Sequence, residues 1–219
     1  MFDLDGTLIA SEKLALEAGA AALADMGFTV PEGLLEAMIG RDDDAAHALL
    51  EAGIGKVDRT ELAGRIGAAF ERRIAAGTLE LRPYAHELLD LLDASPHPLP
   101  RAVATSAQAP SATRKLAATG LAPRFAHVVT RNCVTSPKPA PEPYLRAAAM
   151  LGMTPETCLV FEDSDIGAEA ARAAGMTVVQ IPDLGAASGR HADFLAPDLI
   201  AGARAAGLLP AVVAPQAGR

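Results

Sequence analysis

The sequence predicts an α/β protein in which a parallel sheet is interrupted by a block of helices. After about residue 81, short apolar segments alternate with stretches of helical composition, whereas residues 11–77 have helical spacing and contain no β-branched run. Short buried strands joined by helices form βαβ units, whose strands run parallel and whose sheet is covered on both faces. We therefore expect one parallel sheet with a helical insert.

Four apolar segments are the main strand candidates, and Phe2 stands in a fifth at the start of the chain. The four are residues 102–104, 126–129, 158–161 and 177–181. The stretches between them, residues 111–119, 141–151 and 165–174, have helical composition. Each stretch is followed by a glycine (Gly120, Gly152 or Gly175), the residue that most often ends a helix.

The helical insert follows the first strand candidate directly. The positions with helical spacing are Leu16, Ala20 and Leu23 before a stop at Gly27, then Leu49 and Leu50, then Leu62, Ile66, Ala69 and Arg73. We expect residues 12–80 to form a helical cap, hinged near residues 10–12 and 79–83. Residues 1–11 and 81–219 would form the catalytic core.

The composition narrows the class of protein. The chain has 219 residues, 50% of them hydrophobic and 21% charged, which is typical of a globular protein. A formal net charge of −8 argues against a nucleic-acid surface, and no apolar run approaches the roughly 18 residues of a membrane span. The two cysteines, Cys133 and Cys158, lack metal-ligand spacing. We expect a cytoplasmic monomer or weak homodimer with no nucleic-acid or membrane partner.

Polar side chains follow the strand candidates. Ligands bind beyond the carboxyl ends of the strands in a parallel α/β sheet. The residues at or near such ends are Asp3 and Asp5 after Phe2, Thr105 and Ser106 after 102–104, Lys138 after 126–129, and Glu162 and Asp163 after 158–161. Positions far apart in the sequence are thus expected to meet at one edge of one sheet.

The charges at this edge indicate a divalent cation. Four carboxylates face one obvious cation, Lys138. Two like charges about 4 Å apart repel by roughly 4 kcal/mol at an effective dielectric near 20, so the cluster needs a bound cation, protonation or both. Oxygen ligands without His or Cys favour Mg²⁺. Carboxylates, a metal, a lysine and a hydroxyl together match phosphoryl transfer.

Simpler interpretations exist for these residues. An Asp-x-Asp-Gly segment can open a calcium loop, but that loop needs Gly at its sixth place, where this chain has Leu8. Thr105 could be a strand-end hydroxyl that caps the next segment. Glu162 and Asp163 could stabilise the N-terminus of the following helix, although Ser164 can serve as its cap.

Four segments together resemble the motifs of the haloacid dehalogenase superfamily. They are residues 3–8 (DLDGTL), Thr105, Lys138 within residues 137–142 (PKPAPE), and residues 161–167 (FEDSDIG). They occur in the family's order over nearly the whole chain. The insert after the first motif is similar to the small cap of the β-phosphoglucomutase-like branch, which implies a Rossmann-like core.

The resemblance implies roles for the carboxylates. Asp3 would attack phosphorus and form an aspartyl-phosphate. Asp5 would protonate the leaving oxygen and then deprotonate the attacking water. Mg²⁺ would be held by the Asp3 carboxylate, the Asp5 backbone carbonyl and Asp163, with Glu162 adjacent or acting through water.

It also implies residues that hold the substrate. Thr105, the Ser106 amide and Lys138 would bind the phosphoryl oxygens. Gly6 would let the backbone turn tightly beside the phosphate. Arg41, in the expected cap, is the candidate contact for the distal part of the substrate, unless it simply pairs with the acidic residues 42–44 on a solvated face.

The chain departs from the family pattern at three places. Only Met1 and Phe2 precede Asp3, about 7 Å of strand, where relatives enter through four or more apolar residues. Either this strand is short or the chain starts upstream. Ala10 replaces an Asp of the hinge, and Pro137 replaces a Gly before the lysine. None of these changes removes a chemical group from the expected site.

The expected function is hydrolysis of a small, sugar-phosphate-like metabolite by a Mg²⁺-dependent phosphatase. The alternative is a β-phosphoglucomutase-type mutase, but the hinge histidine of such mutases is Ala15 here and no convincing cap lysine is found. Dehalogenation would leave Asp5 without a task. Phosphonate cleavage would need a cap lysine in a recognisable setting, which neither Lys13 nor Lys56 has. A binding module without chemistry would not need the intact set of motif residues.

Overall fold

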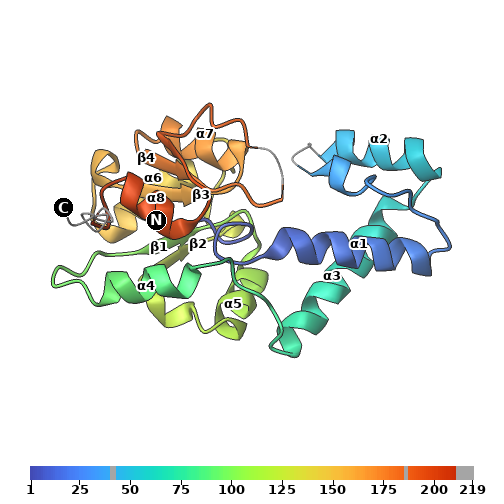
Figure 1. The fold of residues 1–219 in the computed structure, drawn as a ribbon, viewed down its shortest axis with the longest axis horizontal. Helices are drawn as coiled ribbons and strands as arrows, with labels where there is room; N and C mark the ends of the chain where they lie inside the picture. Colours follow the sequence, from blue (N-terminus) through green and yellow to red (C-terminus); the bar gives the residue numbers. More distant parts are fainter. Residues whose placement is uncertain (40–42, 185–186, 211–219) are drawn as a thin grey trace, which may run out of the picture.

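The structure, a computed structural model, describes residues 1–39, 43–184 and 187–210. Figure 1 shows an α/β core and, projecting from one end of it, a group of helices. These helices are α1 (Ser11–Asp25), α2 (Asp43–Ile54) and α3 (Arg59–Ala75), with the short 3-10 helix η1 (Glu36–Met38) between α1 and α2. The block predicted to be helical is therefore helical and spatially separate from the sheet.

The core alternates strands and helices along the chain. Its strands are β1 (Ala102–Ala104), β2 (His127–Val129), β3 (Leu159–Glu162), β4 (Thr177–Gln180) and β5 (Phe194–Leu195). Its helices are α4 (Ala85–Asp93), α5 (Ala109–Ala118), α6 (Glu142–Leu151), α7 (Asp165–Ala173) and α8 (Leu199–Ala205). Three further 3-10 helices are η2 (Ala122–Arg124), η3 (Arg131–Cys133) and η4 (Pro155–Thr157).

Every pairing between the five named strands is parallel. β1 pairs with β2, β3 with β4, and β4 with β5. Phe2 joins the two ladders because it bridges Val103 of β1 and Phe161 of β3, both in parallel. The spatial order is thus β2, β1, Phe2, β3, β4, β5. This arrangement confirms the predicted α/β class with a parallel, Rossmann-like sheet.

Successive residues of each strand pack on opposite faces of the sheet. Val103, Phe161 and Val179 belong to one apolar cluster, which α4, α5 and α8 cover. Their neighbours Val160 and Val178 belong to a second cluster, which α6 and α7 cover. Both faces of the sheet are therefore buried, as expected for a parallel sheet, and only its edges and strand ends remain for a binding site.

The projecting helices have a small core of their own. Leu23 of α1, Leu50 of α2 and Leu62 of α3 are buried together, with Ala22 and Val57. Further apolar side chains of this part, including Leu34, Leu35 and Met38, pack against them partly buried.

The expected face of α1 was partly wrong. Ala20 is exposed and Leu16 only half-buried, whereas Leu14, Ala18 and Ala22 form the buried stripe. α1 lies against α3 along its length, and this contact selects a stripe rotated from the predicted one. The predicted stop is confirmed, because α1 ends at Asp25 and Gly27 takes a positive φ of 86°.

The two connections between the helical part and the core run side by side. Ile9 and Leu81 form an antiparallel bridge, and the Ala10 amide donates to the Glu80 carbonyl at 3.0 Å. The Arg82 amide donates to the Leu8 carbonyl at 2.9 Å. The division into a cap of residues 12–80 and a core of residues 1–11 and 81–219 stays a proposal, and this paired strap is where a hinge between them would lie.

Among the α-helices and strands of the core, α4, α8 and β5 were not predicted. α4 buries Ala85, Leu88, Leu89 and Leu92, whose spacing is that of an amphipathic helix, so the signal was present in the sequence. β5 has only two residues and too little pattern to be recognised. Within the described residues, no helix is both long and apolar enough to cross a bilayer.

Candidate active site

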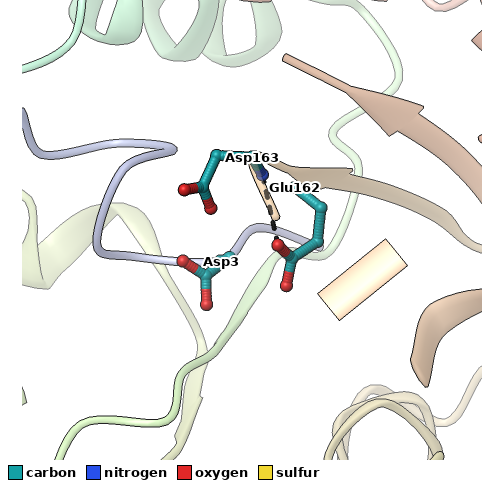
Figure 2. Close-up of side chains that lie close together, drawn as sticks. All are labelled: Asp3, Glu162 and Asp163. Carbon is teal, nitrogen blue, oxygen red and sulfur yellow. Dashed lines mark hydrogen bonds between the residues drawn. The ribbon is translucent and has the colours of Figure 1, made fainter. Parts of the chain in front are cut away.

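Three of the predicted carboxylates meet at the carboxyl edge of the sheet. Asp3, Glu162 and Asp163 each offer an oxygen atom, and these atoms all lie within 4.8 Å of one another. Figure 2 shows the three carboxylates close together, Asp3 on the segment that follows Phe2, Glu162 at the end of β3 and Asp163 directly after it. The sheet itself brings them together, because the Asp3 amide donates to the Phe161 carbonyl at 2.9 Å and places Asp3 beside Glu162, the last residue of β3.

Lys138 enters this cluster from the loop before α6. Its Nζ donates to Asp3 Oδ1 at 2.6 Å and to Glu162 Oε1 at 2.5 Å. The three side chains are only 5%, 9% and 1% exposed, in the order Lys138, Asp3, Glu162. The Nζ atom also lies 4.9 Å from the centre of the Tyr144 ring. A buried ammonium shared by two carboxylates fixes the geometry of both.

Both oxygens of Glu162 accept hydrogen bonds from several donors. Oε1 accepts from Lys138 and from the Tyr144 hydroxyl, the latter at 2.6 Å. Oε2 accepts from the Asp163 amide at 3.1 Å, the bond drawn in Figure 2, and from the amide and hydroxyl of Ser164. Glu162 is therefore an anchor around which the other groups are arranged.

Two glycines make room for these carboxylates. A Cβ on Gly167 in α7 would overlap the Glu162 carboxylate, and one on Gly6 would overlap that of Asp163. Gly6 also has a positive φ of 83°, a conformation that side chains disfavour. Ser164 accepts from the Gly167 amide at 3.1 Å and caps α7, as the sequence predicted, so the acids are not needed for that task.

The site carries more negative charge than the protein alone neutralises. Burial raises the pKa of Asp3 to about 7, although Lys138 opposes the shift. Burial and the Glu162 and Asp3 charges raise the pKa of Asp163 to about 9. Burial by itself would lower the pKa of Lys138, but Asp3 and Glu162 raise it above its ordinary value. One ammonium among three carboxylates leaves a deficit of positive charge, and this all-oxygen donor set fits a hard divalent cation such as Mg²⁺.

Asp5 lies apart from this cluster. Its side chain is 30% exposed, and its Oδ1 accepts from Lys115 Nζ at 2.5 Å. The expectation that Lys138 is the one obvious cation of the site was therefore wrong. Lys115 stands in the buried stripe of α5 with Ala112 and Leu116, and a lysine at a core position of an amphipathic helix is a signal that could have been noticed.

The residues after β1 lie at the same edge of the sheet. Thr105 is buried, and its Oγ1 accepts from the Ala107 amide at 3.0 Å, which leaves the hydroxyl proton free to be donated. Ser106 is exposed. Arg41, the expected contact for the distal part of the substrate, lies outside the described residues. Tyr144 was not predicted, since nothing in the sequence indicates that its hydroxyl meets Glu162.

A parallel sheet, a helical insert after the first strand, and a buried Asp–Lys–acid cluster at the carboxyl edge define the class of protein. The model of the family "Haloacid dehalogenase-like hydrolase" matches residues 1–181. The chain belongs to this family, as the four motifs predicted, and the names of its relatives confirm the predicted class of enzyme, a phosphoric monoester hydrolase.

Individual relatives can be named. Fructose-1-phosphate phosphatase YqaB of Escherichia coli (strain K12) is 32% identical over 185 residues, which are 83% of this chain and 94% of that protein. A HAD family hydrolase from Deinococcus radiodurans R1, solved with bound phosphate and sodium, is 29% identical with a TM-score of 0.76, covering 95% of this chain and 96% of that one. A Thermotoga maritima protein provisionally named a β-phosphoglucomutase is 28% identical with a TM-score of 0.72, covering 89% and 92%.

Proposed function

We propose that the chain is a Mg²⁺-dependent phosphatase that hydrolyses a small, sugar-phosphate-like metabolite through an aspartyl-phosphate on Asp3. The observation that carries the proposal is the buried contact of Lys138 with both Asp3 and Glu162. It holds one oxygen of Asp3 in place, so the other can face a phosphorus atom, and it supplies positive charge where phosphoryl oxygens would lie. The phosphatase among the relatives and the phosphate bound to the Deinococcus protein support this assignment.

The reaction divides into two displacements. A carboxylate oxygen of Asp3 attacks phosphorus, the bond from phosphorus to the leaving oxygen breaks, and that oxygen takes a proton from Asp5. A water molecule then returns a proton to Asp5 and attacks the same phosphorus, and the bond to Asp3 breaks. Asp5 stands in the same short loop as Asp3, and its partial exposure leaves the carboxylate accessible to a leaving group and to water.

The Asp3 and Asp163 carboxylates and the Asp5 backbone carbonyl would hold Mg²⁺ directly. Glu162 would act through water, because its oxygens already accept five hydrogen bonds. The ion would supply the positive charge that lets a phosphate dianion approach this acidic edge. The proposed roles of Thr105, the Ser106 amide and Gly6 follow from their places at the same edge.

Hydrolysis is preferred over isomerisation because of two side chains at the start of α1. A mutase must protect its aspartyl-phosphate from water while the bisphosphate intermediate turns around. Ala15 offers no group that could restrain Asp5, and Lys13 is 60% exposed and lies 4.0 Å from Glu80. Neither side chain is placed to delay water or to grip a second phosphate.

Phosphate release should exceed interconversion of hexose phosphates by at least about ten-fold, a barrier difference of about 1.4 kcal/mol. The test incubates the enzyme and Mg²⁺ with β-glucose 1-phosphate and a trace of the 1,6-bisphosphate, and measures inorganic phosphate and glucose 6-phosphate together. Chelation with EDTA should stop the release and added Mg²⁺ should restore it. Faster formation of glucose 6-phosphate would make the protein a mutase, and full release in EDTA would remove the metal from the proposal.

Mg²⁺ should stabilise the protein much more at pH 8 than at pH 5. The pKa values of Asp3 and Asp163 rise from 3.8 to about 7 and about 9 on folding. Above pH 4 the folded state therefore keeps protons that the unfolded chain has released, so the stability of the metal-free protein falls as the pH rises through 7 and 9. A bound cation replaces those protons and is favoured at high pH.

Thermal unfolding in EDTA and in Mg²⁺ at the two pH values measures this effect. Asp163→Asn is the control and should lose most of the Mg²⁺-dependent shift. Equal shifts at pH 5 and pH 8, or the full shift in the control, would show that the ion binds elsewhere.

A further inference from the structure

Lys115 forms a contact that joins three parts of the molecule. It belongs to α5 of the core, and its Nζ donates to Oδ1 of Asp5, in the loop after the first strand, at 2.5 Å. The same Nζ lies 5.2 Å from the centre of the Phe70 ring in α3, a helix of the projecting part. The side chain of Lys115 is only 9% exposed.

Burying the Lys115 ammonium costs folding free energy unless nearby groups compensate its charge. Lys is among the residues least often buried, and an ammonium taken from water needs partners that replace its hydration. Among the described residues, the Asp5 carboxylate is its only ion-pair partner, and the face of Phe70 supplies a cation–π contact within the usual limit of about 6 Å. The ammonium is therefore held between the ring and the carboxylate.

The contact with Lys115 restricts the side-chain conformation of Asp5. A carboxylate that is 30% exposed and stands in a loop can take several rotamers unless a group fixes one oxygen. Lys115 is fixed by the buried face of α5 and by Phe70, so it acts as a rigid donor. One Asp5 oxygen is thereby held, and the other stays available for proton transfer.

A second pair marks the same contact between helices. Arg114, next to Lys115, donates to Glu71, next to Phe70, at 2.5 Å, and both side chains are nearly half exposed. The pair lies at the same meeting of α3 and α5 but on its solvent side, and an exposed pair contributes little to stability. It therefore provides a matched control for the loss of a basic residue at this contact.

We propose that Lys115 is a positioning residue for the acid/base Asp5, and that Phe70 of the projecting helices completes its pocket. Proton transfer by Asp5 then depends on the packing of α3 against α5. Lys115 is not among the residues proposed to bind the phosphoryl group or the metal. The proposal rests on the proposed function, because it assigns Lys115 a task only if Asp5 transfers protons.

The test is the kinetics of Lys115→Met with p-nitrophenyl phosphate, whose leaving group needs no proton. The first displacement should stay fast and the attack of water should slow, so kcat should fall by about ten- to a hundred-fold and KM should fall with it, which leaves kcat/KM within about three-fold of wild type. A burst of p-nitrophenol approaching one equivalent per enzyme should precede the steady state. Phe70→Leu should lower kcat by a smaller factor in the same way, and Arg114→Met should stay within two-fold of wild type.

A double-mutant cycle with Asp5→Asn separates positioning from general damage. In the Asp5→Asn background, Lys115→Met should change kcat by less than two-fold, because its effect passes through Asp5. If Lys115→Met lowered kcat equally in the wild-type and Asp5→Asn proteins and produced no burst, its role would be merely structural and the inference would be overturned. Unchanged kinetics of Lys115→Met beside an active wild type would overturn the inference alone, whereas an inactive wild type would overturn the proposed function and the inference with it.

Discussion

Asp3→Asn should lower kcat/KM for aryl phosphate hydrolysis by about 10⁴-fold or more. An amide oxygen is a poor nucleophile towards phosphorus, so the first displacement loses its attacking group, and losses of this size are usual when a nucleophile is removed. The substitution also removes one of the two carboxylates that Lys138 contacts and one donor for the cation. Glu162 cannot take over as nucleophile, because both of its oxygens already accept hydrogen bonds from several donors.

The loss should not come from unfolding. Replacing Asp3 by a neutral group of the same shape removes one of three clustered negative charges, and Lys138 keeps Glu162 as its partner. In EDTA at pH 8 the variant should therefore unfold at or above the temperature of the wild type. Activity within a hundred-fold of wild type would show that Asp3 is not the nucleophile.

Lys138→Met should destabilise the protein by about 3–5 kcal/mol, the usual cost of leaving buried charges without their partner. Asp3 and Glu162 would then face each other with no cation between them, in a site where both are almost fully buried. Activity should fall as well, because the phosphoryl oxygens lose their nearest positive charge. Denaturant unfolding at pH 7.5 in EDTA measures the first effect, and phosphate release in saturating Mg²⁺ measures the second.

A second substitution distinguishes charge from packing. Adding Glu162→Gln to Lys138→Met removes one of the two buried carboxylates that have lost their ion-pair partner. The double variant should recover part of the lost stability, although not the activity. Lys13→Met is the control for the loss of an exposed lysine and should change the unfolding free energy little, since its pair with Glu80 is exposed. If Lys138→Met were as stable as the control, the buried ion pair would not be what organises the site.

The features that could be predicted best from the sequence are those that follow from the order of the strands. The convergence of Asp3, Glu162, Asp163 and Lys138 follows from parallel strands whose carboxyl ends share an edge, and the structure places these four together. The strand at residues 102–104 has the predicted bounds, β2 and β4 differ from the prediction by one residue at one end, and β3 is shifted by one residue at both ends. These features are local or follow from topology.

What could not be predicted depends on how separate elements face one another. The pairing of Lys115 with Asp5 requires the rotation of α5 about its axis, and the bond from Tyr144 to Glu162 requires that of α6. The buried stripe of α1 was misplaced for the same reason, since contact with α3 decides which of several small residues turns inward. A sequence fixes the period of a helix more firmly than its rotation against a neighbour.

The most direct test of the account is the location of a trapped phosphoryl group. Asp5→Asn should still form the aspartyl-phosphate from a substrate with a good leaving group and should release it slowly, because the base that activates water is gone. Acid quenching followed by peptide mass spectrometry should find one phosphoryl group, on Asp3, in this variant and none in Asp3→Asn. A phosphoryl group on any other residue, or on the Asp3→Asn protein, would contradict the account.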